Sequence, residues 1–243
     1  MPKPAMSWRR LEYAWRRHGW RLLGPILLHN LARGLARLRG GDTGARVGEL
    51  DRRLGIDTWR EESTALMHVD GANLMRGNRY QPVGEAAFRH VVARLGIDPA
   101  RHAFVDYGSG KGRALLLACE LGFRRVVGVE YARELHEAAL ANLARARGVL
   151  PGAERIECAW SDAASFPPPA GDLVCFLYNP FDGTVLRALL DHLAASFAAE
   201  PRDIVVAYLN PVHRDVADAH PALALQRADG DLAVYRVVRG QGG

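Results

Sequence analysis

The residues best placed to do chemistry lie in a glycine-rich turn between an apolar run and a helix-forming run. The apolar run ends at Asp106, and glycines then recur at every second position, as Gly108, Gly110 and Gly112. This order predicts a strand, a tight turn and a helix N-terminus, where backbone N–H groups and the positive end of the helix dipole meet the polar part of a ligand. Glycine gives the turn its backbone freedom and lets a ligand approach closely. The spacing differs from the G-x-G-x-x-G turn of dinucleotide-binding proteins, whose third glycine would fall on Arg113.

A second acidic residue, Glu130, ends the next β-branched run, 24 positions after Asp106. This distance is close to the offset of about 20 residues at which an acid in a βαβ unit accepts hydrogen bonds from ribose hydroxyls. A carboxylate suits that task because it can accept from both hydroxyls at once. The alternative is a solvated surface acid, but that interpretation must also account for the turn, the helix and the offset together.

The order of elements along the chain indicates the scaffold that positions these residues. From residue 84 onward helix-forming and β-branched runs alternate, and Ala228-Asp229-Gly230-Asp231 is typical of a hairpin turn. The expected helices are 84–95, 112–121, 132–147, 184–199 and 212–219. The expected strands are 103–106, 125–130, 155–159, 172–178, 203–209, 222–227 and 231–238. We therefore expect an α/β fold with a doubly wound, mostly parallel seven-stranded sheet, helices on both faces and one antiparallel strand.

The acid followed by glycines at 108, 110 and 112 resembles the G-x-G-x-G turn of class I S-adenosylmethionine-dependent methyltransferases. A seven-stranded sheet with a reversed last strand is also the architecture of that family. The resemblance implies a Rossmann-like fold, S-adenosyl-L-methionine as cofactor and transfer of its methyl group. By this resemblance we expect the cofactor-binding residues to be Tyr80, Asp106, Gly108, Ser109, Gly110, Gly112, Glu130, Tyr131, Asp162 and Asn179. A glycine-rich turn of an unrelated α/β protein is the alternative.

Candidate residues for methyl transfer follow the fourth expected strand, at Asn179-Pro180-Phe181. They resemble the N-P-P-[YF] signature of amino-methylating enzymes but lack its second proline. In those enzymes the Asn carbonyl and a nearby backbone carbonyl accept hydrogen bonds from the substrate nitrogen, and the aromatic ring packs beside it. The resemblance favours a nitrogen acceptor, in a protein or a small molecule, with Asn179, Pro180 and Phe181 as catalytic residues. An ordinary turn initiated by Asn-Pro is the alternative.

Two further polar residues are expected near strand ends, where open α/β sheets bind ligands. Asp162 follows the third strand, and an acid there in the family accepts a hydrogen bond from the adenine amino group; a helix N-cap is the alternative. His213, three residues after Asn210, could act as a base for an oxygen nucleophile, although we favour a structural role.

A more specific resemblance covers the chain from about residue 50 onward. The segments that carry it are 51–58, 77–82, 108–113 and 178–181, which look like those of a bacterial subgroup of class I methyltransferases with unassigned substrate. By that likeness, Tyr80 and the segment before it would fold over the cofactor. From residue chemistry alone, Arg79-Tyr80 fits a surface turn equally well.

The N-terminal segment stands apart from the rest of the 243-residue chain in charge. Residues 1–39 hold nine basic residues against one acid, a net +8 within a chain of net +5. Trp8, Leu11, Trp15 and Leu22 recur at helical spacing, which predicts an amphipathic helix. Either this helix packs on the domain, which we favour, or it binds an anionic membrane or nucleic acid. We therefore divide the chain into a basic helical extension (1–39), a linker and cofactor-covering segment (40–83) and a methyltransferase domain (84–243).

Other classes of protein are less consistent with this sequence. Cys119, Cys158 and Cys175 lack C-x-x-C spacing and lie in apolar runs, which favours reduced thiols and a cytoplasmic protein. The histidines show no metal-ligand spacing, so we expect no metal site, and the longest uncharged run near the N-terminus, 11 residues, is too short to span a membrane. Two alternatives remain: a non-catalytic S-adenosylmethionine-binding module that docks through its basic helix, and a NAD-dependent oxidoreductase on the same sheet.

Overall fold

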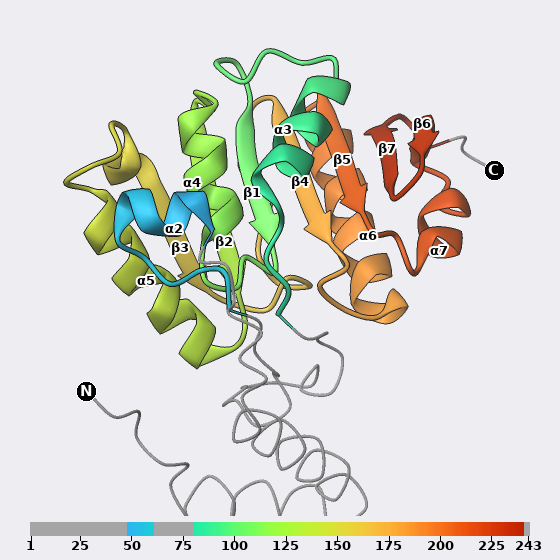
Figure 1. Cartoon of the computed structure of the whole chain (residues 1–243). Coiled ribbons are helices and arrows are strands. Elements are labelled where there is room, and N and C mark those ends of the chain that lie inside the picture. Colours follow the sequence, from blue (N-terminus) through green and yellow to red (C-terminus); the bar gives the residue numbers. More distant parts are fainter. Residues whose placement is uncertain (1–47, 61–79, 241–243) are drawn as a thin grey trace, which may run out of the picture. The chain divides into compact units, whose positions relative to one another are not determined.

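The computed structural model describes residues 48–60 and 80–240 (Figure 1). The described helices are α2 (Glu49–Leu54), α3 (Glu85–Arg94), α4 (Arg113–Glu120), α5 (Arg133–Ala146), α6 (Gly183–Ala199) and α7 (Arg214–Asp218), with a 3₁₀ turn, η2 (Ala153–Arg155). The strands are β1 (Ala103–Tyr107), β2 (Arg125–Glu130), β3 (Ile156–Trp160), β4 (Leu173–Tyr178), β5 (Ile204–Leu209), β6 (Leu223–Asp229) and β7 (Leu232–Val237).

The seven strands form one sheet in the order β3-β2-β1-β4-β5-β7-β6. The first five strands along the chain pair in parallel, and β7 is antiparallel both to β5 and to β6. The last strand along the chain therefore lies inside the sheet, between β5 and the edge strand β6. The direction in which strands are added reverses between β1 and β4, which makes their carboxyl ends the switch point of the sheet.

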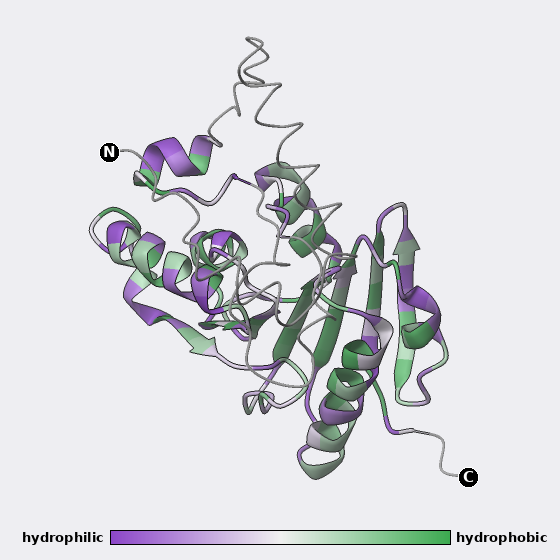
Figure 2. Ribbon diagram, turned by 90° about the horizontal axis from the view of Figure 1, so that it is seen from below, coloured by the Kyte–Doolittle hydropathy of each residue, from purple (hydrophilic) through white to green (hydrophobic). Residues whose placement is uncertain are grey.

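Alternate residues of the central strands face two separate layers of helices. β1, with the sequence AFVDY, is buried at every position, as expected for a parallel strand covered on both faces. Phe104 packs with α3 and α4 in one core, whereas Val105 packs with the leucines of α6 in the other. The central strands are accordingly hydrophobic along their length in Figure 2.

The expected doubly wound sheet is confirmed, including all seven strands and the antiparallel hairpin at the end. The 48–60 part of the segment expected to be a linker contains α2, whose Leu50 and Leu54 belong to the same core as α3 and α4. The expected helix in residues 1–39 lies outside the described residues. None of the helices that are described is both long and apolar enough to cross a membrane.

Candidate functional site

A cavity opens at the switch point, at the carboxyl ends of β1, β2 and β4. Its lining comes from the turn after β1, the end of β2, the end of β4 and the run that leads into α3. The lining residues are Tyr80, Gln81, Pro82, Val83, Asp106, Gly108, Ser109, Gly110, Arg113, Ala114, Glu130, Tyr131, Leu135, Phe176, Tyr178 and Pro180. The cavity volume is about 50 Å³ and the cavity is open to solvent, so a larger ligand would extend into its open side.

The glycine turn has the backbone conformation that its sequence predicts. Gly108, Gly110 and Gly112 have φ values of 100°, 53° and 83°, in the region that residues with a Cβ rarely adopt. A Cβ on Gly108 would lie 2.3 Å from Cβ of Pro180, and one on Gly110 would lie 2.2 Å from the ring of Tyr80. Any side chain at these positions would therefore meet the opposite walls of the cavity.

Glu130 connects the end of β2 to this turn. Its carboxylate accepts hydrogen bonds from the backbone N–H of Gly110 (2.8 Å) and of Ala132 (2.8 Å). Burial raises the pKa of Glu130 to about 7, although these backbone hydrogen bonds act to lower it. The carboxylate is thus fixed in place beside the turn, with both oxygens oriented by backbone donors.

Asp106 is the second buried acid of the cavity. Burial, reinforced by the negative charge of Glu130, raises the pKa of Asp106 to about 8. Two carboxyl groups with raised pKa values in one cavity are a common property of functional sites. They can accept hydrogen bonds from hydroxyl or amino groups, or attract a cationic ligand.

Tyr80 forms the wall opposite the turn. Its ring lies against Gly110, and its hydroxyl donates a hydrogen bond to the carbonyl oxygen of Thr58 (2.7 Å). The three residues that follow Tyr80 also line the cavity. We call residues 80–83 the cavity wall.

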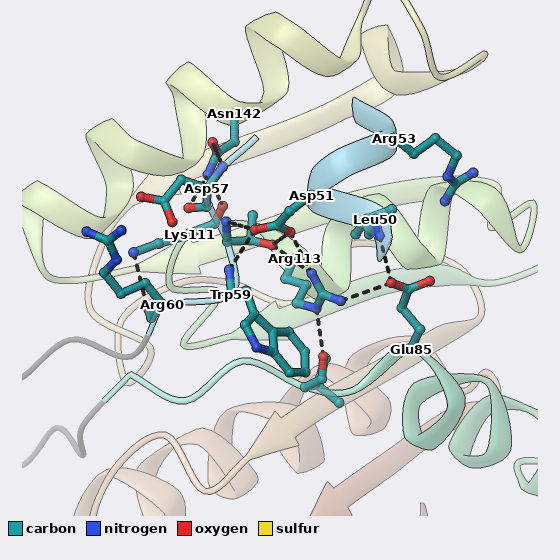
Figure 3. Close-up of polar contacts among 12 residues, drawn as sticks. Leu50, Asp51, Arg53, Asp57, Trp59, Arg60, Glu85, Lys111, Arg113 and Asn142 are labelled. Atoms are coloured by element: carbon teal, nitrogen blue, oxygen red, sulfur yellow. Dashed lines mark hydrogen bonds and ion pairs between the residues drawn. The ribbon is translucent and has the colours of Figure 1, made fainter. Parts of the chain in front are cut away.

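Arg113 occupies the position of the third glycine in a dinucleotide-binding G-x-G-x-x-G turn. Its side chain is buried and makes several polar contacts, which the sequence analysis did not predict (Figure 3). Its Nη1 donates to Asp51 Oδ1 (2.7 Å) and to Thr58 Oγ1 (2.9 Å), and its Nη2 donates to Glu85 Oε1 (3.1 Å). The guanidinium also lies 4.7 Å from the ring centroid of Trp59. The side chain thereby joins the start of α4 to segment 48–60 and to the start of α3.

Two further residues, Lys111 and Asn142, hold segment 48–60 to the glycine turn (Figure 3). Lys111 Nζ donates to the carbonyl oxygen of Arg60 (3.1 Å). Asn142 of α5 accepts from the N–H of Asp57 (3.1 Å) and donates to the carbonyl oxygen of Lys111 (3.1 Å). Lys111 of the turn therefore contacts segment 48–60 and is not part of the cavity lining.

The structure brings together eight of the residues expected at the site. Those that line the cavity are Tyr80, Asp106, Gly108, Ser109, Gly110, Glu130, Tyr131 and Pro180; the lining does not include Gly112, Asp162, Asn179 or Phe181. Gly112 precedes α4, and Asp162 accepts a hydrogen bond from the N–H of Ala164 (2.9 Å) in a turn. Phe181 is buried in the core that contains α6.

Asn179, which follows β4, and Asn210, which follows β5, share an unusual backbone conformation. Asn179 and Asn210 have φ values of 43° and 49°, the positive-φ non-glycine residues of the described chain. They follow Tyr178 and Leu209, which are paired in register between β4 and β5. Left-handed backbone at a non-glycine residue is sparsely populated and is found often at functional sites. His213 lies before α7, with its N–H donating to the hydroxyl of Tyr208 (3.3 Å) rather than lining the cavity.

The lining also includes residues that sequence reasoning missed. Phe176 and Tyr178 point to the same side of β4 as each other, because side chains alternate along a strand. Phe176 packs edge-on against Phe88 of α3, with 5.4 Å between ring centroids. Tyr178 could have been found, since it directly precedes Asn179 at the end of an expected strand.

No family model and no curated protein matches the chain by sequence. Among solved structures, the putative methyltransferase yhhF from Escherichia coli matches with a TM-score of 0.50 and 19% identity, over 71% of this chain and 91% of that one. An RNA methyltransferase from Salinibacter ruber in complex with S-adenosyl-L-homocysteine matches with a TM-score of 0.46 and 19% identity, over 67% and 95%. A ribosomal protein L11 methylase from Lactobacillus delbrueckii subsp. bulgaricus matches with a TM-score of 0.45 and 17% identity, over 63% and 77%. The chain has the Rossmann-like fold of the class I S-adenosylmethionine-dependent methyltransferases.

Proposed function

We propose that the protein is an S-adenosylmethionine-dependent methyltransferase. The observation that carries this proposal is the meeting of the glycine turn, Asp106 and Glu130 in one cavity at the switch point of the sheet. In this proposal the Glu130 carboxylate accepts hydrogen bonds from the ribose hydroxyls, and Gly108 and Gly110 leave room for close approach of the cofactor.

The polar groups of the cavity fit such a cofactor. The Oγ of Ser109 is buried and has no hydrogen-bond partner among the described residues, so it is available to a ligand. Burial raises the pKa values of Asp106 and Glu130 to about 8 and about 7, and the positive charge of S-adenosylmethionine would lower them again, so that the carboxylate forms complement the cofactor. When bound, the sulfonium of the cofactor supplies an activated methyl group, and the protein's task is to orient the acceptor and exclude water.

The position of Arg113 argues against a NAD-dependent oxidoreductase. In a dinucleotide-binding turn, a third glycine at this position allows close packing of helix and strand beside the pyrophosphate. Here the position carries a buried arginine whose guanidinium is bound by Asp51 and Glu85. An ion-pair network therefore occupies the position beside the start of α4 where the dinucleotide-binding turn has its third glycine.

For the methyl acceptor we propose a nitrogen atom, in a protein or a small molecule. Pro180 lines the cavity, and Asn179 precedes it in a left-handed conformation at the end of β4. An amide carbonyl can accept a hydrogen bond from an amine and so align its lone pair, which is sufficient for a neutral amine nucleophile. Phe181 would support this loop from the core beneath it.

Two measurements test the proposed function. Calorimetry should show binding of S-adenosylmethionine and S-adenosylhomocysteine and no comparable binding of NAD. A transfer screen with tritiated methyl groups against protein, RNA, lipid and small-molecule fractions should then label one class of acceptor. Cofactor binding without any transfer would favour the non-catalytic module, and NAD binding alone would contradict the proposal.

A further inference from the structure

We propose that Arg113, Asp51 and Thr58 are positioning residues that fix the cavity wall, residues 80–83, in place for the cofactor. This inference rests on the proposed function for the identity of the ligand. The cavity wall and the hydrogen bonds that hold it are observed in the structure, whatever the ligand is.

Hydrogen bonds join both ends of the cavity wall to the same network. At one end, Arg113 Nε donates to the carbonyl oxygen of Val83 (2.8 Å). At the other end, the hydroxyl of Tyr80 donates to the carbonyl oxygen of Thr58 (2.7 Å). Between these two contacts, all four wall residues line the cavity.

Asp51 closes the connection between the two ends. Its Oδ2 accepts hydrogen bonds from the N–H groups of Thr58 (2.7 Å) and Trp59 (2.8 Å), and its Oδ1 accepts from the hydroxyl of Thr58 (2.6 Å). The same Oδ1 is 2.7 Å from Arg113 Nη1. Tyr80 is therefore linked through Thr58 and Asp51 to the arginine that holds Val83.

The network is buried, so it is shielded from water. The side chains of Arg113 and Asp51 are each 2% exposed, and Thr58 is fully buried. A buried ion pair is a weak source of stability compared with apolar packing, because both charges lose their hydration. It does impose a defined geometry, since each partner left alone would be an uncompensated buried charge.

Arg113 also sits where a cation is unfavourable, at the positive end of α4. Two carboxylates compensate for this position: Asp51 and Glu85, the latter also accepting a hydrogen bond from the N–H of Leu50 (2.8 Å). The donors of Arg113 are thus directed to the wall, to segment 48–60 and to α3. This arrangement fits a positioning role better than direct recognition of the cofactor.

A wall that is already ordered lowers the entropy lost when a ligand binds against it. Loosening the network should therefore weaken cofactor binding even where the altered residue does not line the cavity. Thr58 meets this condition, because its hydroxyl bonds Asp51 and Arg113 and its side chain is outside the lining.

The experiment compares Thr58→Val with Thr58→Ser in the full chain. Valine removes the hydroxyl at nearly constant size, whereas serine keeps it. We expect Thr58→Val to bind S-adenosylhomocysteine about tenfold more weakly by calorimetry and Thr58→Ser to stay within about twofold of the parent. Hydrogen–deuterium exchange of residues 80–88 should become faster in Thr58→Val and remain parental in Thr58→Ser.

Tyr235→Phe controls for a general loss of stability, because it removes a 2.7 Å hydrogen bond to Asp218 far along the sheet. It should lower the melting temperature without changing affinity or the exchange of residues 80–88.

A folded Thr58→Val with parental exchange would overturn the proposal, as would an equal loss of affinity in Tyr235→Phe. If Thr58→Val does not fold, Tyr80→Phe replaces it, and parental exchange and affinity in that variant would equally overturn it. A parent that does not bind S-adenosylhomocysteine would refute the proposed function, and the exchange measurement would still decide the positioning role.

Discussion

The Glu130 carboxylate accepts a hydrogen bond from the N–H of Gly110 at 2.8 Å, which joins the end of β2 to the turn that follows β1. The acid is therefore part of the architecture of the turn as well as a candidate ligand for ribose hydroxyls. Substitutions at Glu130 must separate these two roles.

Glu130→Gln keeps the size of the side chain and one carbonyl oxygen for the backbone donors, but it loses the negative charge. We expect affinity for S-adenosylhomocysteine to fall by about tenfold or more, because charge-assisted hydrogen bonds contribute about 1.5–3 kcal/mol each. Calorimetry would measure this. Glu157→Gln, on the neighbouring strand and paired with Arg125 at the surface, is the control. Equal affinity in both variants would remove Glu130 from the site.

Gly110→Ala tests the close approach at the turn. The new Cβ would lie 2.2 Å from the ring of Tyr80, at a φ of 53°, so we expect loss of measurable cofactor binding. Gly122→Ala is a matched control, since it places alanine at a φ of 80° with nothing within 4 Å. Both variants should lose about 1 kcal/mol or more of folding free energy from backbone strain. Normal binding by Gly110→Ala would show that the turn is not the cofactor site.

The two buried acids predict how stability depends on pH. Because the pKa values of Asp106 and Glu130 are raised to about 8 and about 7, the folded protein retains protons that the unfolded chain loses above about pH 4. The free energy of unfolding should therefore decrease as pH rises from about 4 to 8, by an amount on the order of a few kcal/mol. Urea unfolding at pH 5, 6.5 and 8 would measure this fall, and Asp106→Asn should make it smaller. The same pH dependence in the variant would show that Asp106 is not the titrating group.

Asn179→Ala tests catalysis separately from binding. We expect cofactor affinity within a few-fold of the parent and methyl transfer about a hundredfold slower, the scale for losing one positioned polar group. Asn210→Ala is the matched control, because Asn210 also precedes a proline and has a similar positive φ. Transfer rates are measured with the acceptor found by the tritium screen. Parental turnover in Asn179→Ala would make Asn179-Pro180 an ordinary turn.

A shortened chain beginning at Arg46 tests the two interpretations of the basic segment. If residues 1–39 pack on the domain, as we favour, the shortened chain should lose stability and solubility because an apolar surface becomes exposed. If they bind an anionic surface, the shortened chain should stay stable and lose salt-sensitive co-sedimentation with anionic vesicles. The second result would contradict our preference.

The sequence predicts well those parts of the fold that depend on residues close together along the chain. The positive φ values of Gly108 and Gly110 follow from residue type, and the buried strands follow from their apolar runs. Glu130 could be placed beside the turn because β2 is joined to β1 by one short helix and pairs with it in parallel.

The Arg113–Asp51 ion pair could not be predicted in the same way. The two residues are 62 positions apart, and the sequence offers many other acids to an arginine. Nor could the strand pattern show that Pro180 lines the cavity and Asn179 does not, because the left-handed backbone of Asn179 interrupts the alternation of side chains after β4. The roles of Asn179, Phe181 and Asp162 therefore remain predictions.

The position of β7 has a consequence for the synthesis of the protein. Because this last strand lies between β5 and β6, the sheet cannot close until the ribosome has released residues up to Val237. Until then the edge of β5, whose residues 204–208 are all buried in the finished fold, is open to pairing with other chains. Translation that stopped within the hairpin would leave that edge exposed permanently, so a premature stop codon near residue 230 should yield an aggregating product rather than a slightly shortened protein.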